Sequence, residues 1–194
     1  GSDENNGTDN HPYATIQKAI NESSNGDSIF VSSGTYFENI NFSGKNIVVQ
    51  GEDRETTIID GNQNGSVVTF DSFEDSSSVL KKFTIQNGFS SNGGGIYCVQ
   101  SVGDNNNNSG PTLEDLNVID NVASQGGGGI YLSLSSPKII SSIIKENTSQ
   151  NGGGIACFFD SNPTIIDGTI SNNSSDIDGG GIYATTNSDV QINN

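Results

Sequence analysis

The sequence predicts an all-β fold, a right-handed parallel β-helix in which each coil holds three short strands and about 26 residues. The first observation is an internal repeat, because Gly-Gly-Gly-Ile occurs four times, and periods of roughly 20 to 50 residues are typical of stacked repeats. The second is that apolar residues form short runs bounded by Gly, Asn, Asp and Ser, as strands separated by turns do. The third is that so short a repeat must stack on its neighbours to bury a face. The four copies lie at 93–96, 127–130, 152–155 and 179–182.

Composition and charge narrow the class of protein. A length of 194 residues predicts one domain. The net charge of −16 argues against a nucleic-acid partner, because binding nucleic acid depends on neutralising its phosphates. No run of about 18 apolar residues exists, so we expect no segment that inserts into a membrane. Gly1 and Ser2 resemble the remnant of an expression tag, so the lack of a signal peptide says nothing about export.

The N-terminal part of the domain is predicted to be less regular than the rest. Residues 1–11 are polar and are expected to form a flexible leader. A short capping helix is predicted at about 12–23, where Pro12 suits the first helical position and apolar residues follow at helical spacing. Irregular coils are expected over 27–78 and regular repeats over 79–194, so that one β-helix domain covers residues 12–194.

Within the regular repeats, three core positions and one polar position recur in each coil. The last two steps between equivalent residues, from Leu113 to Ile139 and from Ile139 to Ile165, are 26 residues each. The preceding step, from Leu80, is longer by seven residues, and we assign the excess to a loop at 101–110, which is either a binding loop or a disordered bulge. The polar position is occupied by Asn87, Asp120, Glu146 and Asn172.

The repeated Ile fixes which side chains point into the core. Glycines before it suit a sharp corner, where positive φ is accessible at low cost. Since side chains alternate along a strand, Cys98 and Cys157 should point inward with Leu132 between them. Their Cα atoms would then be about 9 to 10 Å apart, beyond the roughly 7 Å limit of a disulfide, which predicts two free buried thiols. A structural disulfide is the alternative for a secreted protein.

Two resemblances follow from particular motifs. The start of the chain, with Tyr13-Ala-Thr-Ile-Gln-Lys-Ala-Ile20, Gly26-Asp27-Ser-Ile29 and Ile58-Ile-Asp-Gly61, resembles right-handed parallel β-helix proteins of the pectin-lyase-like superfamily, which implies that a helix caps the first coil. The later coils, each with Gly-Gly-Gly-Ile, resemble the glycine-rich repeats of polymorphic outer-membrane adhesins. This scaffold carries lyases, hydrolases, epimerases and adhesins, so the resemblances predict a fold rather than one function.

Groups suited to catalysis are sparse. The only arginine is Arg54 and the only histidine is His11, while Lys138 and Lys145 lie within the later regular repeats. Acid–base catalysis needs its groups within hydrogen-bond reach, and these residues are spread along the chain. The hydrolase motifs that the resemblance would imply, a paired Asp-Asp and a Gly-His-Gly, do not occur. We therefore predict no catalytic residue.

Three tyrosines are the candidate glycan-contacting residues. Tyr97, Tyr131 and Tyr183 each follow the inward Ile and should face outward in one column, which Ala156 interrupts. Such a column could offer aromatic surface to a sugar chain. Aromatic contacts between coils would equally serve stability.

Four carboxylates are the candidate calcium ligands. Asp120 and Glu146 should lie on adjacent coils, with Asp176 and Asp178 at a corresponding turn further along. Calcium takes six to eight oxygen ligands. Stacked polar residues that hydrogen-bond around a turn are the alternative, and a melting temperature raised by millimolar calcium would support the metal site.

These observations predict a non-catalytic, extracellular or cell-surface domain of a larger, exported bacterial protein, adhesive or in contact with carbohydrate. The alternative is the N-terminal part of a polysaccharide lyase or hydrolase whose catalytic coils lie downstream. Ice binding is a third option, but Thr84, Thr112, Thr164 and Thr169 do not form the regular array that it needs. Because Val190 and Ile192 begin another strand, we expect further coils or another domain after Asn194.

Overall fold

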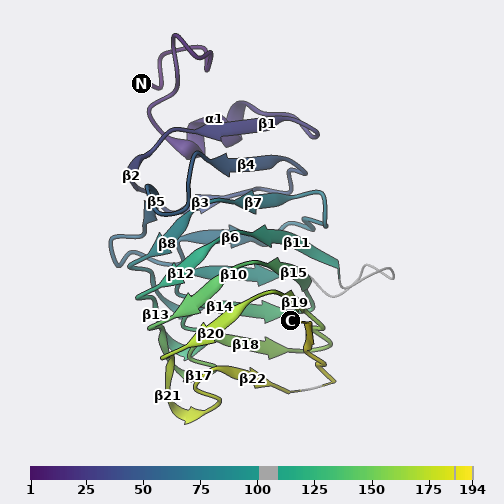
Figure 1. Ribbon diagram of the computed structural model, residues 1–194. Coiled ribbons are helices and arrows are strands. Elements are labelled where there is room, and N and C mark those ends of the chain that lie inside the picture. The colour runs from purple at the N-terminus through teal and green to yellow at the C-terminus, as the bar shows by residue number, and fades with distance from the viewer. Residues whose placement is uncertain (101–108, 186, 194) are drawn as a thin grey trace.

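The computed structural model of the chain, which describes residues 1–100, 109–185 and 187–193, is a right-handed parallel β-helix (Figure 1). All pairings between its named strands are parallel, and successive coils stack from the N-terminal end to the C-terminal end. No helix in the described residues is long and apolar enough to cross a membrane. The fold class predicted from the repeats is confirmed.

The elements, in chain order, have the following bounds: α1 (Ile16–Glu22), β1 (Ser28–Val31), β2 (Gly34–Phe37), β3 (Ile40–Asn41), β4 (Val48–Gly51), β5 (Thr57–Asp60), β6 (Val68–Phe70), β7 (Val79–Lys81), β8 (Thr84–Gln86), β9 (Phe89–Asn92), β10 (Ile96–Val99), β11 (Ser109–Glu114), β12 (Asn117–Ile119), β13 (Val122–Gly126), β14 (Ile130–Ser133), β15 (Ser136–Ile140), β16 (Ile143–Lys145), β17 (Thr148–Asn151), β18 (Ile155–Phe158), β19 (Thr164–Ile166), β20 (Thr169–Ser171), β21 (Ser174–Asp178), β22 (Ile182–Ala184) and β23 (Gln191–Asn193).

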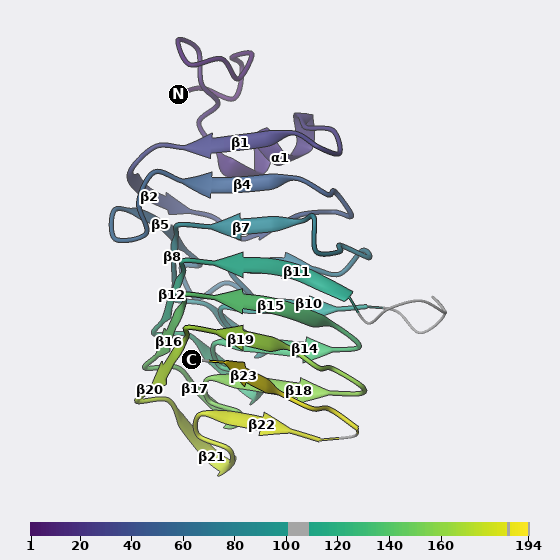
Figure 2. The ribbon, with the colours of Figure 1, turned by 45° about the vertical axis from the view of Figure 1, so that its right-hand side comes forward.

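The strands form four sheets that run along the coil axis. A seven-stranded sheet has the order β1-β4-β7-β11-β15-β19-β23 and is seen face-on in Figure 2. Two six-stranded sheets have the orders β22-β18-β14-β10-β6-β3 and β2-β5-β8-β12-β16-β20. The fourth has four strands in the order β21-β17-β13-β9.

The fourth sheet corrects the expected three strands per coil to four in the regular repeats. Its strands lie in the polar segments between the repeated asparagine or acidic residue and the glycines, for example Ser-Gln-Asn at 149–151. Such residues are typical of turns, so the sequence predicts a turn there. The backbone groups nevertheless pair with the equivalent segments of the neighbouring coils, although with irregular register.

The inward register is as predicted. Leu113 pairs with Leu80 and Ile139, and Ile139 pairs with Ile165, and these side chains are almost fully buried. Cys98 pairs with Leu132, which pairs with Cys157, and both thiols are free and buried. Burial raises the pKa of Cys157 to about 12 and that of Cys98 well above its usual value, so both thiols stay protonated and unreactive.

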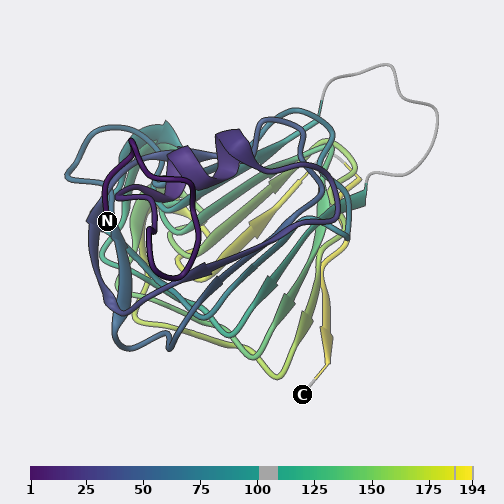
Figure 3. The same cartoon turned by 90° about the horizontal axis from the view of Figure 1, so that it is seen from above.

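Helix α1 covers the N-terminal end of the core, as Figure 3 shows from above. It begins at Ile16 and not at Pro12, because the side chain of Thr15 caps it by accepting a hydrogen bond from the Lys18 backbone amide. The leader before it is tied to this end of the domain, since the carboxylate of Asp3 accepts hydrogen bonds from the backbone amides of Ala14 and Thr15. The helix buries Ile16 and Ile20 against the first coils.

Two charged side chains from the first coils hold the ends of this helix. The Glu38 carboxylate accepts hydrogen bonds from the backbone amides of Ile16 (2.9 Å) and Gln17 (3.0 Å) at the N-terminus. The Lys45 ammonium donates to three carbonyl oxygens at the C-terminus, each at 2.7 Å, those of Ile20, Asn21 and Ser23. Each charge has the sign that the helix dipole favours at its end.

Replacing Lys45 by methionine is therefore expected to destabilise the capped end by about 2 kcal/mol, because charge-assisted hydrogen bonds to otherwise unpaired carbonyls are lost while the aliphatic stem is kept. Urea unfolding followed by circular dichroism measures the change. Lys138→Met is the matched control, since Lys138 is exposed and should shift stability by less than about 0.5 kcal/mol. Equal effects of the two variants would contradict the assignment.

The glycine run forms the corner that the sequence predicts, although only its first residue has positive φ. Gly93, Gly127, Gly152 and Gly179 have φ of 62°, 65°, 64° and 65°. The following glycines are required by close approach, since a Cβ on Gly128 would lie 2.5 Å from the Thr148 carbonyl oxygen. The loop predicted at 101–110 falls outside the described residues except for its last two, which belong to β11.

Candidate functional site

The predicted tyrosines lie in one outward column on the six-stranded sheet that contains β10, β14, β18 and β22, the strands labelled in Figure 1. Tyr97 pairs with Tyr131, Tyr131 with Ala156, and Ala156 with Tyr183, as the register of the repeated Ile requires. The rings of Tyr97 and Tyr131 are parallel within 8°, with centroids 5.6 Å apart. The structure thus brings all three tyrosines into one column.

Phe158 closes the gap that Ala156 leaves in this column. Its ring centroid lies 5.4 Å from that of Tyr131 and 5.6 Å from that of Tyr183. The result is a continuous aromatic ladder, consisting of Tyr97, Tyr131, Phe158 and Tyr183, one ring on each of four successive coils. Sequence reasoning missed Phe158, although it stands two residues after Ala156 and must share its outward face.

The two halves of the aromatic ladder differ in the angle between neighbouring rings. The rings of Tyr97 and Tyr131 are stacked, with an interplanar angle of 8°. Beyond Tyr131 the rings tilt, by 31° between Tyr131 and Phe158 and by 56° between Phe158 and Tyr183. Phe159, 50% exposed, adds a further ring 6.2 Å from Phe158. We call the stacked end at Tyr97 and Tyr131 the closed half of the ladder and the tilted end at Phe158 and Tyr183 its open half.

The hydroxyl groups of the closed half remain neutral hydrogen-bonding groups. Burial raises the pKa of Tyr97, and the nearby carboxylate of Asp71 raises it further. Burial also raises the pKa of Tyr131, with a smaller contribution from Tyr97. Both phenols keep their protons over the physiological range, so each can donate and accept a hydrogen bond.

A polar column borders the aromatic ladder on its β9-β13-β17-β21 side. It runs through Asn92, Gly126, Asn151 and Asp178, which are paired across successive coils after a shift of register. Gly126 is buried against the aromatic ladder, since a Cβ there would lie 3.4 Å from the rings of both Tyr131 and Phe158. Aromatic rings and amide groups thus lie together beside the open half of the ladder.

The four predicted calcium ligands are exposed and fall into two separate places. Asp120 and Glu146 occupy equivalent corners of successive coils, directly after β12 and β16. Asp176 and Asp178 lie on β21. Within the described part of the chain, no three His, Cys, Asp or Glu side chains gather as a metal site would require. Calcium binding at these residues stays a prediction.

The corner that holds Asp120 and Glu146 has a conformational reason for polar residues. Asn87, Asp120, Glu146 and Asn172 have φ of 56°, 54°, 59° and 54°, a left-handed conformation that Asn and Asp tolerate better than most residues.

Sequence reasoning missed the residue after this corner, which forms a buried asparagine ladder. The Asn121 amide donates to Oδ1 of Asn147 at 3.0 Å, and the Asn147 amide donates to Oδ1 of Asn173 at 3.0 Å. The signal was available, since Asn recurs at 121, 147 and 173.

The sparse basic groups named as possible catalytic residues are not brought together. The Arg54 guanidinium bonds the Asp115 carboxylate at 2.9 Å and the Ser141 carbonyl at 3.1 Å, which ties an early loop to coils far along the chain. His11 is exposed in the leader, and Lys138 and Lys145 lie on β15 and β16, in other sheets than the aromatic ladder. Arg54 therefore has a structural role, because its side chain connects one coil to later coils.

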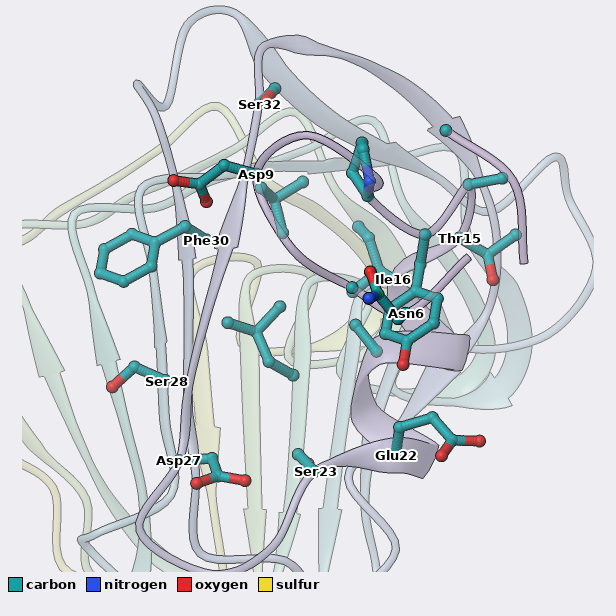
Figure 4. Close-up of a pocket in the computed structure, with 18 of the residues that line it drawn as sticks. Asn6, Asp9, Thr15, Ile16, Glu22, Ser23, Asp27, Ser28, Phe30 and Ser32 are labelled. Atoms are coloured by element: carbon teal, nitrogen blue, oxygen red, sulfur yellow. The ribbon is translucent and has the colours of Figure 1, made fainter. Parts of the chain in front are cut away.

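A hollow of about 680 Å³ lies at the N-terminal end, between the leader, α1 and β1 (Figure 4). Its acidic side chains, Asp9, Glu22 and Asp27, lie apart around the rim and do not converge on one point. Phe30, which is 77% exposed, stands at its edge. None of the predicted site residues lines this hollow.

The fold and the aromatic ladder define a repeat scaffold that carries an outward column of aromatic side chains. The repeat described as "Chlamydia polymorphic membrane protein (Chlamydia_PMP) repeat" matches residues 167–185, which include the corner at Asn172, the rung Asn173 and the last Gly-Gly-Gly-Ile. This likeness supports the resemblance to polymorphic outer-membrane adhesins and points to a surface-associated bacterial protein with an adhesin-like repeat. The comparisons with curated proteins and with solved structures give no match, and the resemblance to the pectin-lyase-like superfamily stays a prediction.

Proposed function

We propose that this domain is a non-catalytic binding module, exported to the cell surface, that contacts glycans through the open half of the aromatic ladder. The observation that carries the proposal is the aromatic surface at the open half, where Phe158 and Tyr183 lie 5.6 Å apart at 56° and Phe159, which is 50% exposed, adds a further ring beside Phe158. Sugar C–H groups pack on exposed aromatic surface of this kind.

The rigid β-helix supports this use of the surface. Phe158 stands on β18, whose inward residues Ile155 and Cys157 are fully buried, and this strand pairs with β14 and β22 of the adjacent coils. Side chains on such strands need little ordering when a ligand binds, which favours affinity. The polymorphic membrane protein repeat adds support for display at a bacterial surface.

Substitutions at the open half test the proposal. A glycan array first identifies a binding oligosaccharide, and isothermal titration then measures its Kd. We expect Phe158→Leu and Phe159→Ala each to weaken binding at least tenfold, because each removes an aromatic face, whereas Phe158→Tyr should bind within twofold of the wild type. Leucine at 158 keeps apolar volume in the ladder, so the loss of stability should be small.

Phe37→Ala is the matched control. Phe37 lies on β2, in a different sheet, and is 69% exposed, so its removal should leave both Kd and melting temperature unchanged. If Phe158→Leu bound glycan as tightly as the wild type, or if the array showed no bound glycan, glycan contact at the ladder would be rejected.

A further inference from the structure

We propose that the aromatic ladder selects uncharged glycans, rich in hydroxyl and acetamido groups, and excludes acidic polysaccharides. The inference rests on the proposed function, because it concerns the chemical class of glycan that the same surface takes. It is argued from the charges around the ladder, from the polar groups beside it and from its spacing.

The surface around the ladder offers no countercharge to an acidic sugar. None of the ten strands in the two sheets that meet beside the ladder contains Lys, Arg or His. The basic side chains of the protein lie in the leader, on α1, in loops or on the other two sheets: His11, Lys18, Lys45, Arg54, Lys81, Lys82, Lys138 and Lys145.

The charges that do lie beside the ladder are negative. The carboxylate of Asp71 is close enough to Tyr97 to raise its pKa, and Asp178 ends the polar column next to the open half. The whole protein carries −16. A uronate or sulfated sugar would therefore lose water from its anionic group without gaining a partner, which costs binding free energy.

The neutral polar groups beside the ladder match hydroxyl and acetamido groups instead. Asn92 and Asn151 present amides on either side of Gly126, and their groups both donate and accept hydrogen bonds. Gly126 packs against the rings of Tyr131 and Phe158, so a sugar substituent at this edge of the ladder would lie near an aromatic ring and an amide together. An acetamido group has this mixed character, with one methyl and one amide.

The spacing of the ladder indicates how a chain would lie. The centroids of successive rings are 5.6, 5.4 and 5.6 Å apart, close to the length of one pyranose unit in an extended chain. A linear glycan lying along the axis would place about one sugar beside each ring. Affinity should therefore rise with chain length and level off once the chain spans the four rings.

The test compares hexasaccharides of matched length that differ in charge. The probes are N-acetylglucosamine hexamer and cellohexaose as uncharged chains, glucosamine hexamer as a cationic chain and galacturonate hexamer as an acidic chain, titrated in 0.15 M and 1 M NaCl. We expect at least tenfold tighter binding of an uncharged chain than of the galacturonate chain in 0.15 M NaCl. In 1 M NaCl the difference in Kd between the uncharged and the galacturonate chains should become smaller, because salt screens the repulsion between the acidic chain and the acidic protein.

Asp178→Lys, which places a cation beside the ladder, should improve galacturonate binding at least threefold while leaving binding of the uncharged chain within twofold. Asp167→Lys is the control variant, because it makes the same change of charge at an exposed position between β19 and β20, in sheets other than the two that meet beside the ladder. The Asp178→Lys variant should gain more affinity for galacturonate than the control variant does.

The outcomes separate this inference from the proposed function. Tighter binding of the galacturonate or glucosamine hexamer than of both uncharged chains would overturn the selection for uncharged glycans, and glycan contact would stand if Phe158→Leu abolished that binding. Absence of binding by every hexamer and on the array would reject the proposed function, and the inference with it. Binding that Phe158→Leu leaves unchanged would show that the glycan occupies another surface, which also overturns the inference.

Discussion

Replacing Asn147 by alanine is expected to lower the free energy of unfolding by about 3 kcal/mol or more, because several buried groups lose their partners at once. Asn147 is fully buried in the middle of the asparagine ladder. Its amide donates to the Val118 carbonyl at 2.9 Å, and its Oδ1 accepts from both the backbone amide and the side-chain amide of Asn121 at 3.0 Å. Alanine leaves these groups without partners in a space that excludes water.

The effect should also reach beyond one coil. In a stacked repeat each coil is stabilised by its neighbours, so a weakened interface between two coils lowers the stability of the whole stack. Urea unfolding by circular dichroism and the melting temperature measure the loss. Gln150→Ala is the control, since Gln150 is exposed in the same coil and should change stability by less than about 0.5 kcal/mol.

An Asn147→Ala protein as stable as the Gln150→Ala control would mean that the buried ladder contributes nothing net. Asn147→Asp gives a second measurement, because it keeps the acceptor for Asn121 but removes the donor for Val118. Its stability should fall as pH rises through the range in which a carboxyl ionises, since a buried carboxylate lacks a cationic partner there.

The coil could be predicted well from the sequence because each coil places the same kinds of residue at equivalent positions. Ile96, Ile130, Ile155 and Ile182 occupy one inward column, and the alternation of faces along their strands then places Cys98 and Cys157 inside and the tyrosines outside. Two free, buried thiols followed from that register and from the spacing between coils, and the structure confirms them. The repeat period of the sequence is thus sufficient to predict inward and outward positions where the fold repeats with the same period.

Features that depend on contacts between residues far apart in the chain could not be predicted from the sequence. The Arg54 guanidinium meets the Ser141 carbonyl 87 positions later, and Lys45 meets the end of a helix 22 to 25 positions earlier. No local pattern encodes such pairs. The fourth sheet escaped for a different reason, because its residues have turn-like composition and pair only through their backbones.

The candidate site was predicted in its register but not in its geometry. The tyrosine column followed from alternation, whereas Phe158 completes the ladder from the next outward position of its strand. Ring tilt depends on side-chain packing, so the distinction between a closed half and an open half required the structure.

The repeated glycine corner carries the second large prediction: Gly152→Ala should destabilise the protein by about 4 kcal/mol, combining the strain of a left-handed alanine with a steric clash. Gly152 has φ of 64°, and an added Cβ would lie 2.3 Å from the Ile155 carbonyl oxygen. That oxygen belongs to the backbone of the same corner, so it cannot move without disturbing the strand that carries the inward Ile. Differential scanning calorimetry and urea unfolding measure the loss.

Gly26→Ala separates the two contributions. Gly26 also has positive φ, at 92°, but an added Cβ there would meet nothing within 4 Å. This variant should lose only about 1 to 2 kcal/mol, the cost of the backbone conformation alone. If the two variants lost equal stability, the clash at the corner would be relieved at no cost and the glycine would be needed only for its φ. A larger loss at Gly152 would instead show that the corner requires glycine because neighbouring carbonyl groups occupy the place of a side chain.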